Sequence, residues 1–288
     1  MTFDTQLARI KANIEAKTKN SNIEAGTDPL HELADNTVTK SHALSRAYYR
    51  LGLVEKRCME ALISKLHPQR GDNIIQEMEL SALEYSKAYN VTDKTAYRDI
   101  ANAVQGLMHR VITADRQDGK KGRIELTLMI KSEYKDDEGR ISCAFNPLII
   151  PYLIGLRDKF SSYPLKNAVN FSSSYTWRFY ELLVSWAQPK QDTDGIFAGW
   201  ITNQSVTDLR NMLGVPDSYT WGMFQKKVLD IALKELREKA HIVVSIKQRK
   251  TVRKITHLDI EFIENSQTEI KLEGGELPKK KRVRKPKK

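Results

Sequence analysis

The sequence VTDLRNMLGVPDSYTWGMFQKKVLDIALKELREKAHIVVSIKQRKTVRKITHLDIEF occupies residues 206–262 of a 288-residue chain. Apolar residues at helical spacing predict a short helix over 205–213 and a long helix over 218–239, joined by a Gly-Val-Pro-Asp turn. Alternating apolar residues then predict a β-hairpin whose strands, 241–247 and 254–262, flank a basic tip. A helix, a turn, a second helix and a hairpin in this order are typical of a winged helix-turn-helix unit.

The same order of elements occurs once before, in the first half of the chain. Helical patterns over residues 41–66, 78–88 and 94–111 precede a predicted hairpin with strands 123–131 and 141–145. The sequence therefore predicts two units of one kind in tandem, the second of which opens with a helical stretch, SYTWRFYELLVSWA.

The two units also match position by position. Seven pairs of chemically similar residues are separated by a constant offset of 124 residues. The pairs are Tyr85 with Leu209, Val91 with Val215, Asp93 with Asp217, Tyr97 with Trp221, Ile100 with Phe224, Val104 with Val228, and Leu107 with Ile231. Because the matches include the turn and one face of the following helix, we predict an internal duplication. The expected fold class is α+β, with two tandem winged-helix domains.

Composition divides the chain into four segments. Residues 1–36 form a polar leader, and a stretch rich in Ser and Asn over 158–174 marks the seam between the two units. We predict an N-terminal winged-helix domain over 37–160, a C-terminal winged-helix domain over 161–265 and a disordered basic tail over 266–288.

The net charge of +11 is concentrated in two places. Residues 279–288 hold eight basic and no acidic residues, and residues 219–256 hold ten basic against three acidic residues. Such clustering points to a polyanion such as nucleic acid, and the alternative is a solvated surface with a solubilising tail. The N-terminus lacks the apolar core of a signal peptide, and no apolar run approaches the ~18 residues of a membrane span. We therefore expect a cytoplasmic protein without membrane association.

The long helix of the C-terminal unit is predicted to bury one face and offer the other to DNA. At about 100° per residue, Phe224, Val228, Ile231 and Ala232 share a sector with Trp221. The opposite face supplies the predicted DNA-binding residues Tyr219, Gly222, Met223, Lys226 and Lys227. A lysine reaches guanine or phosphate, and a glycine permits close backbone approach. The basic hairpin adds Lys247, Arg249, Lys250, Arg253 and Lys254, which suit phosphates or a minor groove.

The N-terminal unit is expected to make a weaker, secondary DNA contact. Its outward helix face carries Thr95, Arg98 and Asn102, of which Arg suits guanine and Asn suits adenine. The predicted hairpin tip, residues 136–138, is acidic and repels DNA. This unit therefore either binds DNA less tightly or holds a protein partner. For both units, a merely solvated helix face is the alternative.

Enzyme classes find little support in the sequence. Neither a GxxxxGK[ST] nor a GxGxxG phosphate loop occurs, and the six histidines form no HxH or HExxH motif. We therefore expect no cofactor, no metal site and no catalytic residues. A DNA-nicking enzyme needs a nucleophilic tyrosine, and the adjacent Tyr48 and Tyr49 lie on an apolar helical pattern that favours core or interface positions.

The sequence resembles the iteron-binding replication initiator (Rep) proteins of theta-replicating bacterial plasmids. The resemblance rests on three stretches: NTVTKSHALSRAYYRLGLVEKR, SYTWRFYELLVSWA and residues 206–262 quoted above. It implies two duplicated winged-helix domains, with monomers on direct repeats at the origin and dimers on an operator of the protein's own gene. It further implies that Met223, Lys226 and Lys227 lie on the recognition helix, that residues 247–254 form the DNA-contacting wing, and that the N-terminal domain dimerises.

We therefore expect a replication initiator without enzymatic activity, which binds double-stranded DNA at specific sequences and also represses its own gene. The resemblance implies host partners, namely the helicase and initiator proteins, and a bacterial setting. Two alternatives remain: a winged-helix repressor without a replication role, and a DNA-nicking replication enzyme. The tail over 278–288 lies outside the resemblance. It is similar to a nuclear import signal, but in bacteria it is more simply an electrostatic DNA tether.

Overall fold

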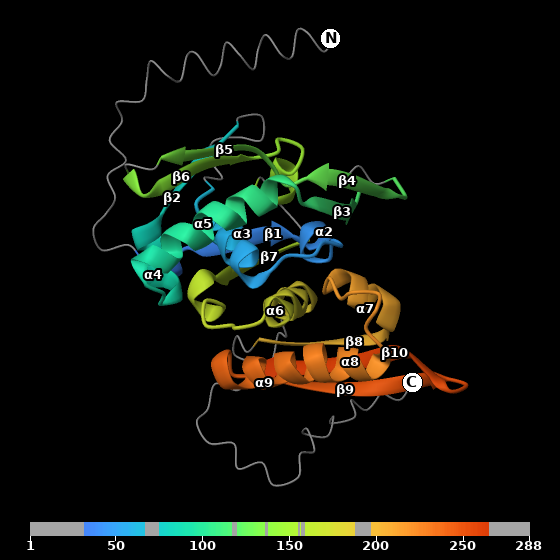
Figure 1. Cartoon of the computed structure of the whole chain (residues 1–288). Helices are drawn as coiled ribbons and strands as arrows, with labels where there is room; N and C mark the ends of the chain where they lie inside the picture. The colour runs from blue at the N-terminus through green and yellow to red at the C-terminus, as the bar shows by residue number, and fades with distance from the viewer. Residues whose placement is uncertain are drawn as a thin grey trace, which may run out of the picture.

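The computed structural model of the chain describes residues 32–66, 75–116, 120–135, 138–154, 156, 159–187 and 197–264. The predicted tail and all but the last few residues of the predicted leader lie outside these ranges. The described elements form an upper and a lower unit in Figure 1, which meet along helix α6.

The upper unit is the first winged helix-turn-helix. Its elements in chain order are α3 (Leu53–Ser64), β2 (Glu77–Ser81), α4 (Ala82–Tyr89), α5 (Asp93–Met108), β5 (Met129–Lys135) and β6 (Arg140–Phe145). The three strands form an antiparallel sheet in the order β2-β6-β5. Ser81 ends β2 and caps α4, since its side chain accepts a hydrogen bond from the Glu84 amide and the Glu84 carboxylate accepts one from the Ser81 amide.

The lower unit repeats this arrangement. Its elements are α6 (Ser174–Trp186), β8 (Ala198–Ser205), α7 (Val206–Met212), α8 (Trp221–Phe224), the π-helical turn η6 (Gln225–Leu229), α9 (Asp230–Lys239), β9 (Ile242–Thr251) and β10 (Lys254–Glu264). The sheet order β8-β10-β9 is that of the first unit. Ser205 ends β8 and caps α7 by accepting from the Asp208 amide, 124 residues after Ser81. The fold class predicted from the sequence is therefore confirmed.

Several elements lie outside this common plan. They are η1 (Leu33–Asp35), β1 (Thr37–Ser41), α2 (His42–Ser45), β3 (Val111–Asp115), β4 (Arg123–Thr127), η4 (Ile150–Tyr152), β7 (Phe160–Pro164) and η5 (Leu165–Asn167). Strands β3 and β4 form a separate hairpin inserted after α5. Strand β1 pairs with β7 along its whole length, with Thr37 opposite Pro164. This pairing joins β7, which begins at residue 160, to the first strand of the first unit.

Some predicted elements differ from the observed ones because tertiary pairing overrides local pattern. The predicted helix over 41–66 is two helices, α2 and α3, separated by an extended segment that includes the bridge between Tyr48 and Thr113. The predicted strand over 123–131 is broken at Leu128 into β4 and β5, and the start of the predicted helix over 78–88 is β2. The second hairpin is longer than predicted, because Thr251 pairs with Lys254 and leaves only a two-residue turn.

One cluster of buried apolar residues runs through both units. In α5 the buried side chains include Ile100, Val104 and Leu107. In the second unit Phe224 and Val228 take the equivalent places, but Ile231, the predicted partner of Leu107, is 42% exposed. The π-helical turn η6 inserts one residue at this point, so that Ala232 of the predicted sector is buried while Ile231 turns outward. The predicted burial of Ile231 was wrong for this reason.

Candidate nucleic-acid interface

The helix α8–η6–α9 is held on the second unit by its apolar face and by a structured turn before it. Phe224, Val228 and Leu236 are fully buried, and Thr220 caps α8 by accepting from the Met223 amide. Arg210 of α7 closes the turn, since its Nη2 donates to the Pro216 carbonyl at 3.1 Å and to the Tyr219 carbonyl at 2.6 Å. Sequence reasoning missed this role of Arg210, which becomes visible only from the folded turn.

The opposite face of this helix carries the predicted recognition residues. Gly222, Lys226 and Lys227 are exposed, and Tyr219 and Met223 are half-buried. The Lys227 ammonium lies 5.6 Å from the centre of the Tyr219 ring, a cation–π arrangement that orients the lysine. A Cβ atom built on Gly222 meets nothing within 4 Å, so the fold itself does not require glycine there.

The hairpin β9–β10 gathers the remaining predicted cations. Lys247, Arg249, Lys250, Arg253 and Lys254 are all exposed. Arg249 is held on the sheet, because its Nε donates to Asp259 Oδ2 at 2.8 Å. This hydrogen bond, helped by one from the Asn203 amide, lowers the pKa of Asp259. Among the described residues, the other four cations form no ion pair with an acidic side chain, so their charge is available to an external anion.

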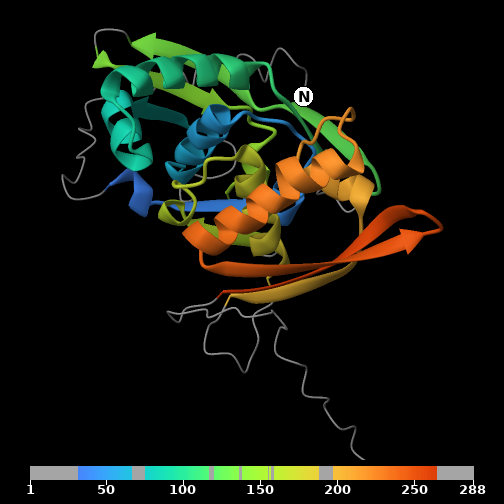
Figure 2. The ribbon, with the colours of Figure 1, turned by 60° about the horizontal axis from the view of Figure 1, so that its bottom comes forward.

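The helix face and the hairpin end lie at the same end of the second unit. In Figures 1 and 2 the hairpin projects to the right, beyond the end of the long helix that carries α8. The turn at its end consists of Val252 and Arg253, with Val252 93% exposed and in a left-handed conformation at φ 58°. The fold thus brings together the two predicted groups of DNA-binding residues, which are separated by about twenty residues in the sequence.

The first unit presents a less basic surface. Arg98 and Asn102 are exposed on α5, with Arg98 Nη2 at 3.5 Å from Asp99 Oδ1, and Thr95 is half-buried. The Thr95 hydroxyl oxygen accepts a hydrogen bond from Thr92, the residue that caps α5. The structure therefore places Arg98 and Asn102 on an accessible face, while Thr95 takes part in the helix cap.

The hairpin of the first unit neutralises its own charge. Its three cations each contact a carboxylate: Lys131 with Glu77 at 3.0 Å, Lys135 with Glu79 at 2.6 Å and Arg140 with Glu79 at 3.1 Å. These hydrogen bonds, that from Lys135 first, lower the pKa of Glu79 and keep it ionised. Two of the three acidic residues predicted at its tip, 136 and 137, lie outside the described residues.

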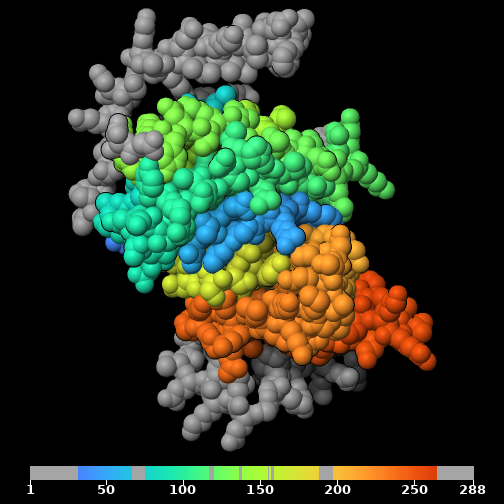
Figure 3. Space-filling view, viewed as in Figure 1, coloured from blue at the N-terminus to red at the C-terminus, as the bar shows by residue number. Residues whose placement is uncertain are grey.

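The two helix faces lie on one side of the molecule. Helix α5 and helix α8–α9 both face the viewer in Figure 1 and run in opposite directions, and the hairpins β5–β6 and β9–β10 extend to opposite sides. Figure 3 shows the surfaces of both helices on this same face, with the blue N-terminal elements and the yellow surface of α6 between them. This arrangement allows both helices to approach one elongated ligand at the same time.

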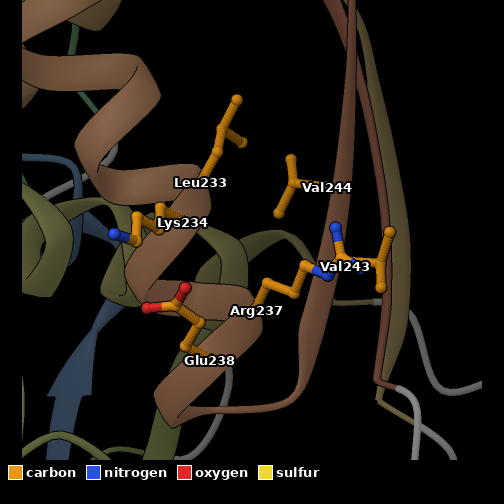
Figure 4. Close-up of a pocket in the computed structure, with 6 residues that line it drawn as sticks. All are labelled: Leu233, Lys234, Arg237, Glu238, Val243 and Val244. Atoms are coloured by element: carbon orange, nitrogen blue, oxygen red, sulfur yellow. The ribbon is translucent and has the colours of Figure 1, made fainter. Parts of the chain in front are cut away.

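A groove of about 620 Å³ lies at the other end of the long helix, between α9 and β9. Figure 4 shows its lining, in which Arg237 extends from the helix toward Val243 on the strand. Its apolar walls come from Leu233, Val243 and Val244. The groove lies away from the predicted recognition residues and does not include them.

The two tyrosines considered as nucleophiles are engaged in structural contacts. Tyr49 is buried, and desolvation raises the pKa of its hydroxyl group, which accepts from Arg178 at 2.6 Å. Tyr48 donates to Asp208 Oδ1 at 3.0 Å and accepts from Arg123 at 2.8 Å. Burial also raises the pKa of both cysteine thiols, that of Cys143 to about 12 and that of Cys58 well above its usual value.

Neither a metal cluster nor a membrane-spanning helix occurs within the described ranges. In that part of the chain, no three His, Cys, Asp or Glu side chains are placed to hold a metal ion. Every helix there is too short or too polar to cross a lipid bilayer.

The fold and the sequence are both similar to those of known proteins. The described fold is similar to the crystal structure of the Pi initiator protein in complex with iteron DNA, with 22% sequence identity, coverage of 81% of this chain and 99% of that chain, and a TM-score of 0.62. An uncharacterized 27.6 kDa protein of Escherichia coli is 22% identical over 215 residues, which are 72% of this chain and 87% of that protein. Residues 37–184 match the family model for the first winged-helix domain (WH1) of initiator replication proteins, and residues 205–262 match that for the second (WH2). The chain therefore belongs to the family of initiator replication proteins.

Proposed function

We propose that this protein initiates replication by binding double-stranded DNA, reading the repeats of an origin mainly through WH2. One observation carries the proposal. The long helix, with exposed Lys226 and Lys227, and the β9–β10 hairpin, with its exposed cations, lie together at one end of WH2. A helix of this kind enters a major groove, and an adjacent basic hairpin reaches the flanking phosphates or the minor groove.

The charge distribution supports WH2 as the principal contact. Lys226 and Lys227 form no ion pair among the described residues, and neither do Lys247, Lys250, Arg253 and Lys254. Their neutralisation by phosphates releases counterions, which favours binding and makes it depend on salt. Helix α5 of WH1 lies on the same side of the molecule (Figure 1), and its exposed Arg98 and Asn102 supply a secondary contact.

The proposal has three further parts. Monomers bind the direct repeats, a dimer formed through WH1 represses the protein's own gene, and the bound protein contacts a host helicase and a host initiator. Family membership and the resemblance seen in the sequence support them. The protein acts in this proposal without chemistry of its own, in the bacterial cytoplasm.

The direct test is footprinting of the full chain on DNA that flanks its own gene. We expect protection of tandem repeats, and replacement of Lys226 and Lys227 by Ala should weaken binding by about 1–3 kcal/mol for each lysine that touches a base. The matched control replaces Lys87 of α4 and Lys166 of η5 by Ala, which removes the same charge from exposed positions outside both DNA-facing helices. Equal affinities of the two double variants would remove the long helix from the proposed interface.

Two further measurements separate the alternatives. Repression without replication predicts that the protein shuts off its own promoter but does not support maintenance of a plasmid that carries the repeats. A nicking enzyme predicts relaxation of supercoiled origin DNA and a covalent tyrosine–DNA adduct in the presence of Mg²⁺. We expect plasmid maintenance and no adduct, since Tyr49 is buried and Tyr48 lies between the two domains.

A further inference from the structure

The contact between WH1 and WH2 is built from backbone and polar groups that fit closely. Gly214, in the turn after α7, has φ 67°, and a Cβ atom there would lie 2.7 Å from the Tyr49 carbonyl oxygen. Arg46 of WH1 donates from Nη2 to the Ser185 carbonyl at 2.6 Å and from Nε to Ser185 Oγ at 3.1 Å. Tyr48 reaches Asp208 of α7. The helix-turn-helix of WH2 therefore rests directly on residues 46–50 of WH1.

Arg178 lies at the centre of this contact. It is 3% exposed, and all three guanidinium nitrogens donate hydrogen bonds. Nε and Nη2 bind the Met212 carbonyl at the end of α7, at 3.1 and 2.9 Å, and Nη2 also binds the Ala47 carbonyl of WH1 at 3.0 Å. Nη1 binds the Tyr49 hydroxyl at 2.6 Å and Glu181 Oε2 at 2.7 Å. One planar group thus joins the backbones of both domains.

A buried charge cluster holds α6, and with it Arg178, against β1 and α3 of the first unit. Glu181 and Glu60 share the ammonium groups of Lys40 and Lys56, with Lys56 at 2.7 Å from Glu181 and 2.6 Å from Glu60. Tyr163 donates to both carboxylates, at 3.0 and 3.1 Å. Burial by itself raises the pKa of Glu181, but Lys40, Lys56 and Arg178 hold it well below its usual value. A cluster of this kind is satisfied in one geometry only, which fixes the position of α6.

We propose that Arg178 is a positioning residue that fixes the separation and rotation of the two DNA-facing helices, so that the protein selects DNA sites by the spacing of the two segments it reads. The proposal rests on the proposed function, in which α5 and α8–η6–α9 contact the same duplex. Each inserted base pair moves one segment by about 3.4 Å and rotates it by about 34° about the DNA axis. A rigid connection between the domains cannot follow such a change, whereas a loose one can.

The test compares DNA sites with one, two, three or five base pairs inserted between the segments protected by WH1 and by WH2. We expect the affinity of the wild-type protein to fall about tenfold on insertion of two base pairs, equivalent to about 1.4 kcal/mol. Arg178→Lys keeps the positive charge beside Glu181, but a single ammonium cannot replace the hydrogen bonds of three nitrogens. We expect the affinity of this variant to fall by about threefold or less on the same insertion, equivalent to about 0.7 kcal/mol.

A second variant guards against a folding defect at the buried arginine. Gly214→Ala disturbs the same contact from the WH2 side without touching a charge, because its Cβ atom would meet Tyr49 and Arg50. Lys166→Ala, which removes only an exposed ion pair with Asp35 and none of the contacts between the two domains named above, is the control and should keep the wild-type spacing preference. Circular dichroism and thermal unfolding identify which variants are folded.

The outcomes are distinct. Flattened spacing preference in folded Arg178→Lys or Gly214→Ala supports the proposal. An unchanged preference in the folded variants overturns it, and so does a wild-type protein that binds its repeat regardless of spacing or protects a single segment; the proposed function survives both results. Absence of specific DNA binding by the wild-type protein would instead overturn the proposed function itself.

Discussion

The hairpins of WH1 and WH2 share one topology but use charge in opposite ways. In WH1, Lys131, Lys135 and Arg140 each contact a glutamate on strand β2 of the same sheet. Among the five described cations of the WH2 hairpin, Arg249 alone is paired with a carboxylate, that of Asp259. An internally paired cation has little to gain from a phosphate, because binding must first break an existing contact. The comparison indicates that after duplication one hairpin leaves most of its cations available to an external anion, as the proposed DNA-binding role requires, while the other neutralises its own charge.

The largest difference between the two hairpins is expected when three cations are removed from each of them in turn. Replacing Lys250, Arg253 and Lys254 by Ala should lower DNA affinity and reduce the slope of log affinity against log salt by up to about 2.7, which is about 0.9 for each phosphate contact. Fluorescence anisotropy over a salt series measures both quantities.

The matched triple variant of WH1 replaces Lys131, Lys135 and Arg140 by Ala. It removes the same charge, yet we expect the salt slope to stay near the wild-type value. If both triple variants reduce the slope equally, both hairpins bind phosphates and the contrast between the domains disappears.

A second contrast lies on the two helices, where Gly222 of WH2 corresponds to Arg98 of WH1 at the offset of 124 residues. Gly222→Ala meets no neighbouring atom within 4 Å. It should stabilise the fold by about 0.5–1 kcal/mol through helix propensity. If the DNA backbone or bases approach Gly222 closely, the same change should weaken specific binding by about fivefold or more, about 1 kcal/mol. Thermal unfolding of this variant measures the change in stability, and DNA titration measures the change in affinity. A stabilised protein with full affinity would show that DNA does not approach Gly222 closely.

A third prediction makes the WH1 hairpin resemble that of WH2. Glu79→Gln releases Lys135 and Arg140 from their shared carboxylate, and non-specific DNA affinity should rise by about twofold, the effect of one exposed contact. Because the folded state lowers the pKa of Glu79, its stabilising contribution is present above about pH 4.5 and diminishes as the pH falls through the lowered pKa. The stability difference between wild type and variant in urea should therefore shrink below that pH, and a constant difference would argue against these ion pairs.

A fourth contrast concerns the turns of the two hairpins. Gly139 in WH1 and Val252 in WH2 have nearly the same left-handed conformation, at φ 59° and 58°. Valine is strained there because its branched Cβ crowds the backbone, whereas glycine is not. Val252→Gly should therefore raise stability by about 0.5–1 kcal/mol and Gly139→Val should lower it by a similar amount. Val252→Ala, which keeps the Cβ atom, serves as the control and should show a smaller gain.

Much of the architecture followed from local pattern. The apolar periodicities over residues 206–262 predicted two helices and a hairpin, and the offset of 124 residues predicted the duplication. Both were reliable because a surface helix or strand must show its buried face in its own sequence. The pattern failed after Gln225, where the π-helical turn shifts the buried face by one residue. It also failed at β1 and β7, which pair across about 120 residues of sequence.

The sequence predicted which residues make up the candidate interface, but not which of them are held by other residues of the chain. The sequence identified Lys226, Lys227 and the hairpin cations as a group, since exposed charge on an amphipathic helix is visible in the pattern. It did not distinguish Arg249, which Asp259 holds, from its unpaired neighbours. It also did not reveal Arg210, whose contacts with two carbonyls depend on the folded turn.

The sequence by itself determined the fold class, the duplication and the concentration of positive charge in WH2, because these properties are carried by neighbouring residues. Only the tertiary structure decided which charges are neutralised and which are buried. Lys40 meets Glu181, and Lys56 and Arg178 surround the same carboxylate, although Lys40 and Glu181 lie 141 residues apart in sequence. A buried charge is stable only when its partner is brought to it from elsewhere in the chain, and no local pattern records that partner.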